Sequence, residues 1–306
     1  MEGVRDGLTS VIVVAADSGA LLLQCVDRVL ASGAPVEIIV VDNASRDGFP
    51  AKAAVAHGGD ARFRLIENAA NRGFGPACNQ GAAAARGDAL LFLNPDCLID
   101  ADAIATLRAI ADADRSIGLL GVDVRTPDGA RARGNRRRDP TLRRAFMTIS
   151  GLSRFQSRWP AFAGVEMPEA VEAVEAVEAP RVERVDAVSG ACMFVPRAMF
   201  ERVGGFDDAY FLHVEDLDLC RRIRDAGDAV AIANEVRVVH AQGSSSRHRP
   251  VFVAGHKRHG MWRYFTKYDQ AARNPLLRAL VWTGLWMRFA LSATAALWPP
   301  SRSRSG

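Results

Sequence analysis

Residues that could bind a metal ion follow one apolar run of the sequence. Asn94-Pro95-Asp96 comes directly after Ala89-Leu90-Leu91-Phe92-Leu93. Because Pro95 removes a backbone donor and stiffens the turn, the Asp96 carboxylate should project beyond the end of a buried strand. Hard divalent cations take such oxygen ligands. The tripeptide alone also fits a plain turn or the cap of a following helix, so the metal hypothesis needs support from other segments.

Two further segments could bind a nucleotide. Asp42 ends the apolar run of residues 36–41 and could accept a hydrogen bond from the ring N–H of a pyrimidine base, while Asn43 and Ser45 close the turn. Asn71-Arg72-Gly73-Phe74-Gly75 leads into a helix that contains Asn79, so glycines, an arginine and a helix N-terminus could approach an anion. An Asx-turn and a glycine-rich turn without ligands are the alternative interpretations.

Two adjacent acids, Glu215 and Asp216, open a stretch with the apolar spacing of a helix. The positive end of the helix would stabilise carboxylates, so helix capping is one interpretation. The other is a general base that takes the proton of an acceptor hydroxyl while a nucleotide diphosphate departs. His240 ends a predicted strand and could bind the same metal ion as Asp96 through an imidazole nitrogen, or it could be structural.

Apolar strands that alternate with helices must hold these polar groups in place. Near-continuous apolar runs are typical of parallel strands covered on both faces, and ligands bind beyond the carboxyl ends of such strands. We interpret the repeated Ala-Val-Glu triplets between residues 166 and 178 as an acidic insertion. The patterns predict strands over residues 10–16, 36–41, 63–66, 89–93, 185–195 and 229–239, and helices over 19–32, 49–56, 76–86, 198–203 and 217–226.

The composition of the 306-residue chain fits one large α/β domain with or without an appendage, since 49% of its residues are hydrophobic. The five cysteines form no CxxC pair, which disfavours a zinc site or a disulfide framework and favours a reducing compartment. No apolar run follows the charged N-terminus, so we expect a cytoplasmic protein.

The net charge of +4 suits anionic partners such as nucleotide diphosphates, phospholipid headgroups or nucleic acid. Seven arginines lie between Arg131 and Arg144. This run lacks interleaved aromatic residues, which disfavours a nucleic-acid-binding protein. We interpret it as a solvated or membrane-facing surface that could also guide a phosphorylated acceptor.

The segment of residues 276–298 is apolar and, if helical, long enough to cross a bilayer. Arg288 in its middle opposes full insertion, so a helix lying in the membrane interface is favoured over a spanning one. Cations and aromatic residues within residues 256–268 match an interfacial belt. A helix buried against the rest of the protein is the alternative.

Motifs throughout the chain, in this order, resemble those of glycosyltransferase family 2, especially its bacterial rhamnosyltransferase-like branch. The resemblance covers residues 11–268 and implies a GT-A fold, an inverting mechanism and a nucleoside-diphosphate-sugar donor held with Mg²⁺ or Mn²⁺. The motifs are Val40-Val41-Asp42-Asn43-Ala44-Ser45, Asn71-Arg72-Gly73-Phe74-Gly75, Asn79-Gln80-Gly81, Leu93-Asn94-Pro95-Asp96, Ser189-Gly190-Ala191-Cys192, Gly204-Gly205-Phe206-Asp207, the stretch of residues 211–222 that contains Glu215-Asp216, and Val238-Val239-His240.

The resemblance also implies roles for individual residues. Asp216 would be the catalytic base, supported by Glu215, which would also contact the acceptor. Asp96 would bind the metal ion, with His240 as a second protein ligand. The acceptor-side loop beneath the donor sugar would contain Ser189 and Gly190, and the donor site would contain Asp42, Asn43, Ser45, Arg72, Gly73, Asn79 and Asn94.

Two positions depart from the family pattern. Ala15-Ala16-Asp17-Ser18 stands where relatives commonly carry a Thr-Tyr-Asn-type turn, so the usual nucleotide contacts from that loop are in question. Asn94 replaces the first acid of an Asp-x-Asp motif, which leaves metal binding to depend on Asp96. A catalytically silent nucleotide-sugar or carbohydrate-binding protein is therefore an alternative. A nucleotidyltransferase is a further alternative, disfavoured because no glycine-rich phosphate loop follows the first strand.

These observations predict a GT-A domain over residues 1–245 and a helical, membrane-associated region over 246–306. The domain would have a Rossmann-like donor half (8–125), an acceptor half (126–245) and the acidic insert (165–184). We expect a donor such as dTDP-rhamnose, an acceptor that is a saccharide or a polyprenyl-diphosphate-linked glycan, and a role in cell-surface polysaccharide or glycolipid synthesis. The enzyme would bind peripherally, through its C-terminus, to the inner face of the cell membrane and would have no nucleic-acid partner.

Overall fold

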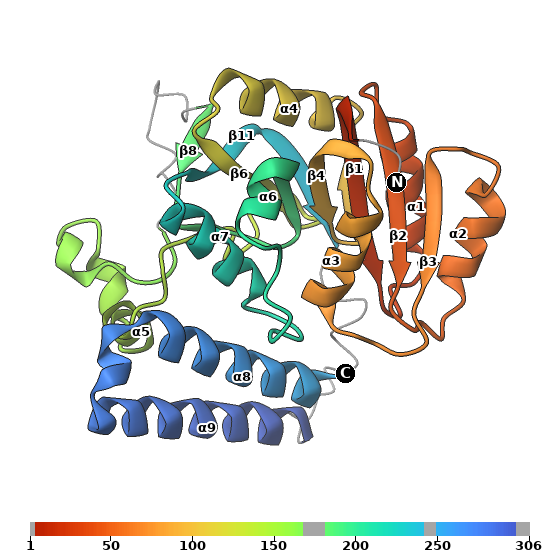
Figure 1. The fold of residues 1–306 in the computed structure, drawn as a ribbon. Coiled ribbons are helices and arrows are strands. Elements are labelled where there is room, and N and C mark those ends of the chain that lie inside the picture. Colours follow the sequence, from red (N-terminus) through yellow and green to blue (C-terminus); the bar gives the residue numbers. More distant parts are fainter. Residues whose placement is uncertain (1–3, 168–180, 242–248, 298–306) are drawn as a thin grey trace, which may run out of the picture.

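The computed structural model describes residues 4–167, 181–241 and 249–297 (Figure 1). Most of the predicted acidic insert and the predicted domain boundary at residue 245 lie outside these ranges. A mixed sheet of nine strands forms the centre of the molecule, with helices on both of its faces.

The first part of the chain alternates strands and helices, as predicted. Strands β3, β2, β1 and β4 lie side by side in this order, and each neighbouring pair is parallel. The elements are β1 (Arg5–Ala15), α1 (Leu21–Leu30), β2 (Val36–Asp42), α2 (Phe49–His57), β3 (Phe63–Glu67), α3 (Phe74–Ala84) and β4 (Gly87–Leu93).

Successive residues of β1 point to opposite faces of the sheet, as the period of a strand requires. Val11 and Val13 pack into one apolar core, to which α1 contributes Leu22. Ile12 packs into a second core on the other face, to which α3 contributes Ala77. Because both faces are covered and these strands are parallel, their carboxyl ends form one edge at which polar loops can meet.

The second part of the sheet is not parallel throughout, so the prediction of a parallel sheet is wrong there. Strand β10 runs antiparallel between β4 and β6, β11 runs parallel to β6, and β5 runs antiparallel to β11. An apolar run indicates that a strand is buried but not its direction. The elements are β5 (Cys97–Ile99), α4 (Ala103–Ala113), β6 (Ile117–Arg125), β10 (Cys192–Pro196), α6 (Arg197–Arg202), α7 (Glu215–Asp225) and β11 (Ala229–His240).

The strand predicted over residues 185–195 is two strands in the structure. A turn at Gly190 separates β9 (Ala187–Val188) from β10. β9 pairs with β7 (Arg136–Arg137) in a small second sheet, beside the catalytic candidates of α7. The same region of the chain contains α5 (Leu142–Ile149), the short helices η1 (Leu152–Phe155) and η2 (Pro160–Phe162), and β8 (Val182–Arg184), which joins the large sheet next to β11.

The arginine run of residues 131–144 is only in part the solvated surface that we expected, since Arg133 and Arg143 are exposed but other members are not. Arg136 is buried and pairs with Asp123 and Glu183. Arg137 pairs with Asp216. These two arginines can lie in the interior because each meets an acid from another part of the chain, which the local sequence does not reveal.

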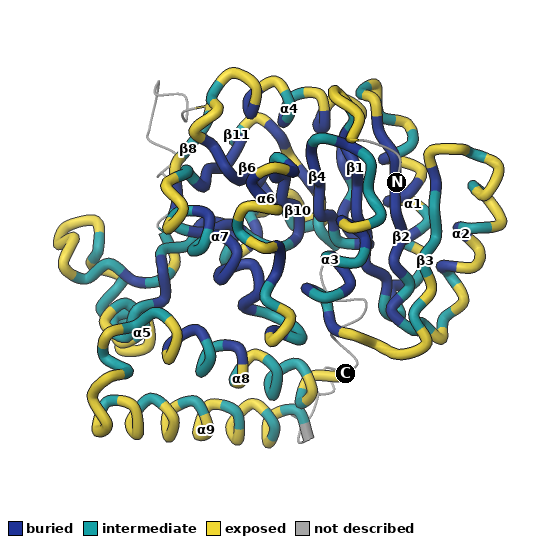
Figure 2. Tube along the Cα trace, viewed as in Figure 1, coloured by how far each residue is buried: buried dark blue, intermediate teal, exposed yellow. Residues whose placement is uncertain are grey.

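The C-terminal residues form a helical hairpin. It consists of α8 (Pro250–Tyr268), η3 (Gln270–Arg273) and α9 (Pro275–Leu297), and α8 lies between α9 and the rest of the molecule (Figure 1). α8 buries Tyr264 and Phe265, whereas α9 is partly or fully exposed wherever its burial is described (Figure 2). None of the helices within the described residues is long and apolar enough to cross a membrane.

Part of the predicted interfacial belt holds α8 against the protein instead. Lys267 pairs with Asp207 and with the fully buried Asp218, and the Tyr268 hydroxyl donates to the same Asp218. The buried Tyr264 hydroxyl donates to Asp139. These side chains therefore contact the rest of the protein, because Asp207, Asp218 and Asp139 lie opposite them.

Candidate active site

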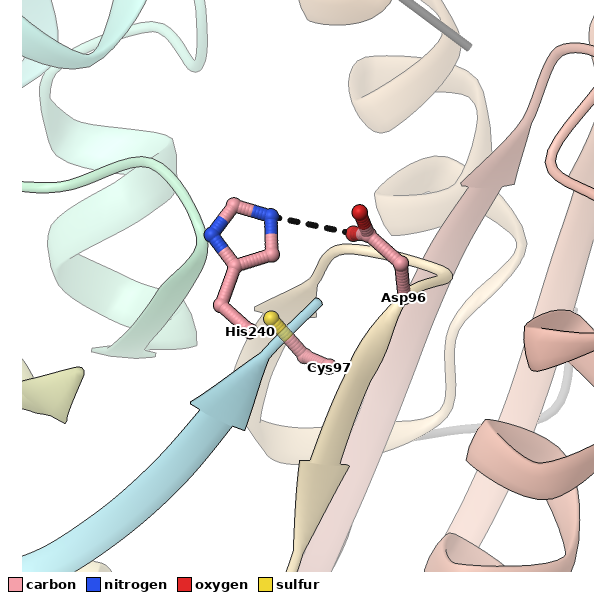
Figure 3. A group of neighbouring side chains, drawn as sticks. All are labelled: Asp96, Cys97 and His240. Atoms are coloured by element: carbon pink, nitrogen blue, oxygen red, sulfur yellow. Dashed lines mark ion pairs between the residues drawn. The ribbon is translucent and has the colours of Figure 1, made fainter. Parts of the chain in front are cut away.

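The strand pairing of β5 and β11 brings Asp96 and His240 together. Cys97 is the register partner of His240, so Asp96, which immediately precedes β5, lies beside the end of β11. The Asp96 Oδ1 atom lies 3.0 Å from His240 Nε2, and both side chains are largely buried (Figure 3). The two predicted metal ligands therefore meet although 144 residues separate them in sequence.

The chemistry of this pair fits a divalent cation. A carboxylate oxygen and an imidazole nitrogen are suitable ligands for Mg²⁺ or Mn²⁺. The 3.0 Å between Asp96 Oδ1 and His240 Nε2 is the distance of a direct ion pair, so both atoms would lie within reach of a cation bound at this position. Within the described residues these are the two ligands that the site offers, so a bound cation would keep other positions for a diphosphate and water.

The Cys97 thiol lies within 4.8 Å of both ligand atoms but does not suit the same ion. Its Sγ atom donates to the backbone oxygen of Ala191 at 3.5 Å. Burial and the neighbouring Asp96 raise the pKa of Cys97 well above its usual value, so it stays a neutral thiol. Hard cations prefer oxygen and nitrogen ligands to a protonated sulfur.

Asn94 connects the metal candidates to the turn before β10. Its backbone N–H donates to Ala191 O at 2.9 Å, and its side-chain Nδ2 lies 3.4 Å from His240 Nε2. The first position of the Asn-Pro-Asp turn thus contacts both the histidine and the loop that contains Ser189 and Gly190. In that loop, the Ser189 hydroxyl accepts from the backbone N–H of Ala191 at 3.3 Å.

Asp42 forms the Asx-turn that was one interpretation of its position. Its Oδ1 atom accepts from the backbone N–H of Ser45 at 2.9 Å. The Ser45 hydroxyl in turn accepts from the backbone N–H of Asp17, within the loop that departs from the family pattern. Asp42 remains partly exposed at the carboxyl edge of the sheet, so the turn presents its carboxylate to solvent.

Asn43 is buried and bonded entirely within the chain. Its Nδ2 donates to Asn71 Oδ1 and Gly73 O, and its Oδ1 accepts from the backbone N–H of Arg72 at 2.9 Å. These bonds fix the glycine-rich loop against the end of β2. The Arg72 side chain is exposed, so the loop presents a cation outward from a rigid base.

Gly73 and Asn79 join this loop to the residues that precede α7. A Cβ atom at Gly73 would lie 2.7 Å from Phe211 O, and its φ of +94° also favours glycine. Asn79 donates to Phe206 O and Asp208 and accepts from the Phe206 N–H. Both residues were predicted to contact the donor. The structure shows that they connect the glycine-rich segment to residues 206–211.

Asp216 lies at the first turn of α7 and is held by three donors. Arg137 Nη2 and the backbone N–H of Gly190 donate to its Oδ2 atom, at 2.5 and 3.1 Å, and the N–H of Leu217 donates to Oδ1 at 2.8 Å. A Cβ atom at Gly190 would approach the Asp216 side chain to 3.3 Å, so the glycine permits close contact. The predicted acceptor loop and the predicted base are therefore in direct contact.

The two neighbouring acids differ in protonation. Burial works against ionisation of Asp216, but the charge and hydrogen bond of Arg137 outweigh it and lower the pKa of this carboxyl. Burial and the charge of Asp216 raise the pKa of Glu215 to about 8. Glu215 Oε2 is buried and has no hydrogen-bond partner in the described part of the chain. Asp216 is thus a carboxylate and Glu215 a carboxylic acid at neutral pH.

Three cations in or beside this site were not predicted as site residues. Arg137 and Lys257 of α8 lie near Asp216, and Arg288 of α9 lies near Lys257. Burial and the positive charges of Arg288 and Arg137 lower the pKa of Lys257. Arg288 is exposed, and neither cation forms an ion pair with an acid of the described residues, although Asp216 and Glu166 lie close enough to Lys257 to act on its pKa. The excess of arginines in residues 131–144 was the one sequence signal for Arg137.

Comparisons with known proteins identify the family of this chain. The sequence model of the family described as Glycosyl transferase family 2 matches residues 10–165. The N-acetylglucosaminyl-diphospho-decaprenol L-rhamnosyltransferase of Mycobacterium tuberculosis is 32% identical over 256 residues, which cover 76% of this chain and 79% of that protein. The succinoglycan biosynthesis protein ExoO of Rhizobium meliloti is 36% identical over 120 residues, 39% of this chain and 34% of that protein.

Solved structures share the fold at low sequence identity. The mannosyltransferase PcManGT from Pyrobaculum calidifontis, in complex with GDP-Man and Mn²⁺, superposes with a TM-score of 0.57 at 19% identity and covers 94% of this chain and 75% of that one. GalNAc-T7 with UDP, GalNAc and Mn²⁺ superposes with a TM-score of 0.60 at 14% identity, over 92% of this chain and 55% of that one. The GT-A-like α/β fold with a mixed central sheet is thereby confirmed.

Proposed function

Because this chain belongs to glycosyltransferase family 2, we propose that it transfers rhamnose, with inversion, from dTDP-rhamnose to a saccharide carried on a polyprenyl diphosphate. Family membership makes the chain a glycosyltransferase that uses a nucleotide-sugar donor, and it disfavours a silent binding protein and a nucleotidyltransferase. The rhamnose donor and the N-acetylglucosaminyl-diphospho-polyprenol acceptor are proposed from the activity of the mycobacterial relative. A role in cell-surface glycan synthesis agrees with that relative and with ExoO.

One observation supports the catalytic part most directly. The pair Asp96–His240 and the ion pair Arg137–Asp216 are connected through the turn of residues 189–191. The Asn94 N–H donates to Ala191 O on one side, and the Gly190 N–H donates to Asp216 on the other. A donor sugar bound at this turn would have its diphosphate on the side of Asp96 and His240, and the proposed base Asp216 on the other side.

In the proposed reaction, Asp216 accepts the proton of an acceptor hydroxyl as that oxygen forms a bond to the anomeric carbon. The bond between the anomeric carbon and the diphosphate breaks, and the diphosphate leaves with the electron pair. Asp96 and His240 would hold a divalent cation, which when bound supplies positive charge to the diphosphate. Asp42 and Ser45 would contact the nucleotide, and the protonated Glu215 would donate a hydrogen bond to the acceptor.

The acceptor diphosphate is proposed to lie near Lys257 and Arg288. The positive charges of Arg288 and Arg137 lower the pKa of Lys257, although Asp216 and Glu166 act in the opposite direction, so like charges gather around Lys257. A diphosphate would remove this repulsion. The position of Lys257 and Arg288 on the C-terminal hairpin also suits a substrate that reaches the site from a membrane, to which the exposed apolar side chains of α9 would bind.

The direct test follows release of the nucleotide diphosphate with a panel of nucleotide sugars in the presence of Mn²⁺. We expect transfer from dTDP-rhamnose to a short-chain N-acetylglucosaminyl-diphospho-prenol, with inverted configuration in the product by NMR. Transfer of another sugar would overturn the donor assignment. Equal rates with and without the acceptor diphosphate would overturn the acceptor assignment and leave the glycosyl transfer itself intact.

A further inference from the structure

A second apolar surface lies far in sequence from the C-terminal hairpin. Four large apolar side chains of α5, η1 and their neighbourhood are exposed: Phe146 (59%), Ile149 (78%), Phe155 (39%) and Trp159 (48%). We call these four residues, which extend from α5 to Trp159 at the start of η2, the α5–η2 surface. α5 packs against η1, and η1 against η2, so these side chains belong to one region of the surface. Exposed apolar side chains that gather in one region commonly mark an interaction surface.

The sequence of α5 explains where the helix begins and why its apolar side chains share one face. Thr141 caps the helix by accepting from the N–H of Arg144, so the helix has a defined start. Phe146 and Ile149 are three residues apart and share one face of the helix. α5 buries none of its own residues, so its apolar face is not used in the core of the described chain. Trp159 stacks edge to face with Phe155 and Phe162, which gives the surface a rigid aromatic part.

The segment that contains this surface carries charges of one sign, although acids of other segments lie beside it, such as Asp186, which pairs with Arg144, and Glu166, near Arg154. Residues 141–163 contain no aspartate or glutamate, but they contain four arginines. Arg154 lies 4.7 Å from the ring of Phe155, and Arg158 lies 5.5 Å from the ring of Trp159. Cations beside aromatic rings at an apolar surface are the arrangement that suits the headgroup region of an anionic membrane.

The α5–η2 surface lies close to the C-terminal hairpin. The backbone N–H of Leu142 donates to Asp269 Oδ2 at 2.7 Å, which ties the start of α5 to the turn between α8 and α9 (Figure 1). Asp269 is the last acid of the chain, and no aspartate or glutamate follows it. The exposed Leu276, Leu280 and Trp282 at the near end of α9 continue the apolar and cationic character across this junction.

We propose that the α5–η2 surface is a second membrane-contact surface, which binds an anionic lipid bilayer together with α9. Two separate contacts fix the orientation of the protein on the membrane, whereas the single helix α9 would leave it free to rotate about its own axis. The proposal rests on the proposed use of a lipid-linked acceptor, since that substrate must enter from the bilayer. The chemistry favours lipid over a protein partner because both segments lack acids and carry arginines at their apolar edges.

The test measures sedimentation of the full chain with vesicles. One set contains phosphatidylcholine alone, and in the other a third of the lipid is phosphatidylglycerol. The double variant Ile149→Ser, Trp159→Ser should lower partitioning to the anionic vesicles by about tenfold or more. Arg154→Gln should lower it by about fivefold and should weaken its salt dependence. Val55→Ser, at an 89% exposed position of α2, is the matched control and should bind as the wild type does.

Other outcomes separate this proposal from alternatives. Unchanged partitioning of the double variant would overturn it. So would concentration-dependent dimerisation in the absence of lipid that the double variant abolishes, because the surface would then bind a second copy of the chain. Donor hydrolysis without acceptor should be the same in all variants, since these residues lie outside the proposed catalytic site. A different sugar donor, with lipid binding still dependent on this surface, would overturn only the proposed function.

Discussion

Arg137 donates a hydrogen bond to Asp216 and so connects the small sheet of β7 and β9 to the first turn of α7. The same guanidinium also donates to Val188 O, which fixes its position. Arg137 therefore holds the Asp216 carboxylate ionised and correctly oriented before any substrate binds. An ionised carboxylate can accept a proton, and this relationship leads to the first two predictions.

Asp216→Asn should lower kcat by about 10²- to 10⁴-fold, since the amide cannot accept the proton of the acceptor hydroxyl. The substitution keeps the size of the side chain, and thermal unfolding should show that the protein is folded. Asp225→Asn changes an exposed acid at the end of the same helix and should leave turnover unchanged. Near-normal turnover of a folded Asp216→Asn variant would remove Asp216 from the mechanism.

Arg137→Gln should move the acidic limb of the kcat/KM profile to higher pH. Arg137 lowers the pKa of Asp216, so its removal raises that pKa, and the base is then protonated at a pH where the wild type is still active. Arg137→Lys retains the charge and should show a smaller displacement. An unchanged limb with a uniform loss of rate would indicate that Arg137 has only a structural role.

Glu215→Gln should become more stable relative to the wild type as the pH rises. The folded protein holds the proton of Glu215 up to about pH 8, whereas the ordinary value for this carboxyl is 4.5. Between these values the unfolded chain loses the proton first, so the wild type loses stability with rising pH. The glutamine variant cannot ionise and should escape this loss. The measurement is the difference in Tm between the two proteins from pH 4.5 to pH 9, and a constant difference would contradict the assignment.

Asp96→Asn and His240→Ala should each raise the Mn²⁺ concentration needed for half-maximal activity by about tenfold or more. Each substitution removes one of the two atoms that lie 3.0 Å apart. Chelation with EDTA should abolish turnover of the wild type, and added Mn²⁺ should restore it. Asp100→Asn, four residues further on and exposed, is the matched control. The same Mn²⁺ requirement in all variants would exclude this pair as the metal site.

Lys257→Ala combined with Arg288→Ala should raise KM for the diphosphate-linked acceptor by about tenfold or more, because two cations no longer meet the diphosphate. KM for the nucleotide sugar should change little. Lys52→Ala, which removes an exposed lysine from α2, should alter neither value. A rise in the KM of the donor alone would assign these cations to the departing nucleotide diphosphate.

The sequence predicted the parallel part of the sheet correctly because its strands are continuously apolar and its helices are amphipathic. β1 and α1 are the clearest examples, with alternate residues of the strand buried on opposite faces. The direction of β10 could not be predicted, since antiparallel and parallel central strands have the same apolar composition. The apolar C-terminal segment was correctly expected to be helical, but its hairpin with α8 depends on long-range pairs such as Lys267–Asp218.

The sequence also predicted part of the candidate site. Side chains at strand ends, such as Asp96 and His240, could be placed at one edge because parallel strands share that edge. Arg137 could not, because nothing in an arginine-rich segment distinguishes the one member that meets Asp216. Asn43 also differs from expectation in its contacts, since its amide is satisfied within the chain by a loop almost 30 residues away.

The antiparallel strand β10 also constrains how the chain folds. β1 to β4 can pair as soon as they emerge from the ribosome, but the free edge of β4 stays open until β10 is synthesised about a hundred residues later. Until then an apolar strand edge is exposed, and the turn that joins Asn94 to Asp216 does not exist. A fragment that ends at residue 165 would therefore contain most of the loops proposed to bind the nucleotide and yet lack both a closed sheet and a complete site, so it should aggregate during expression.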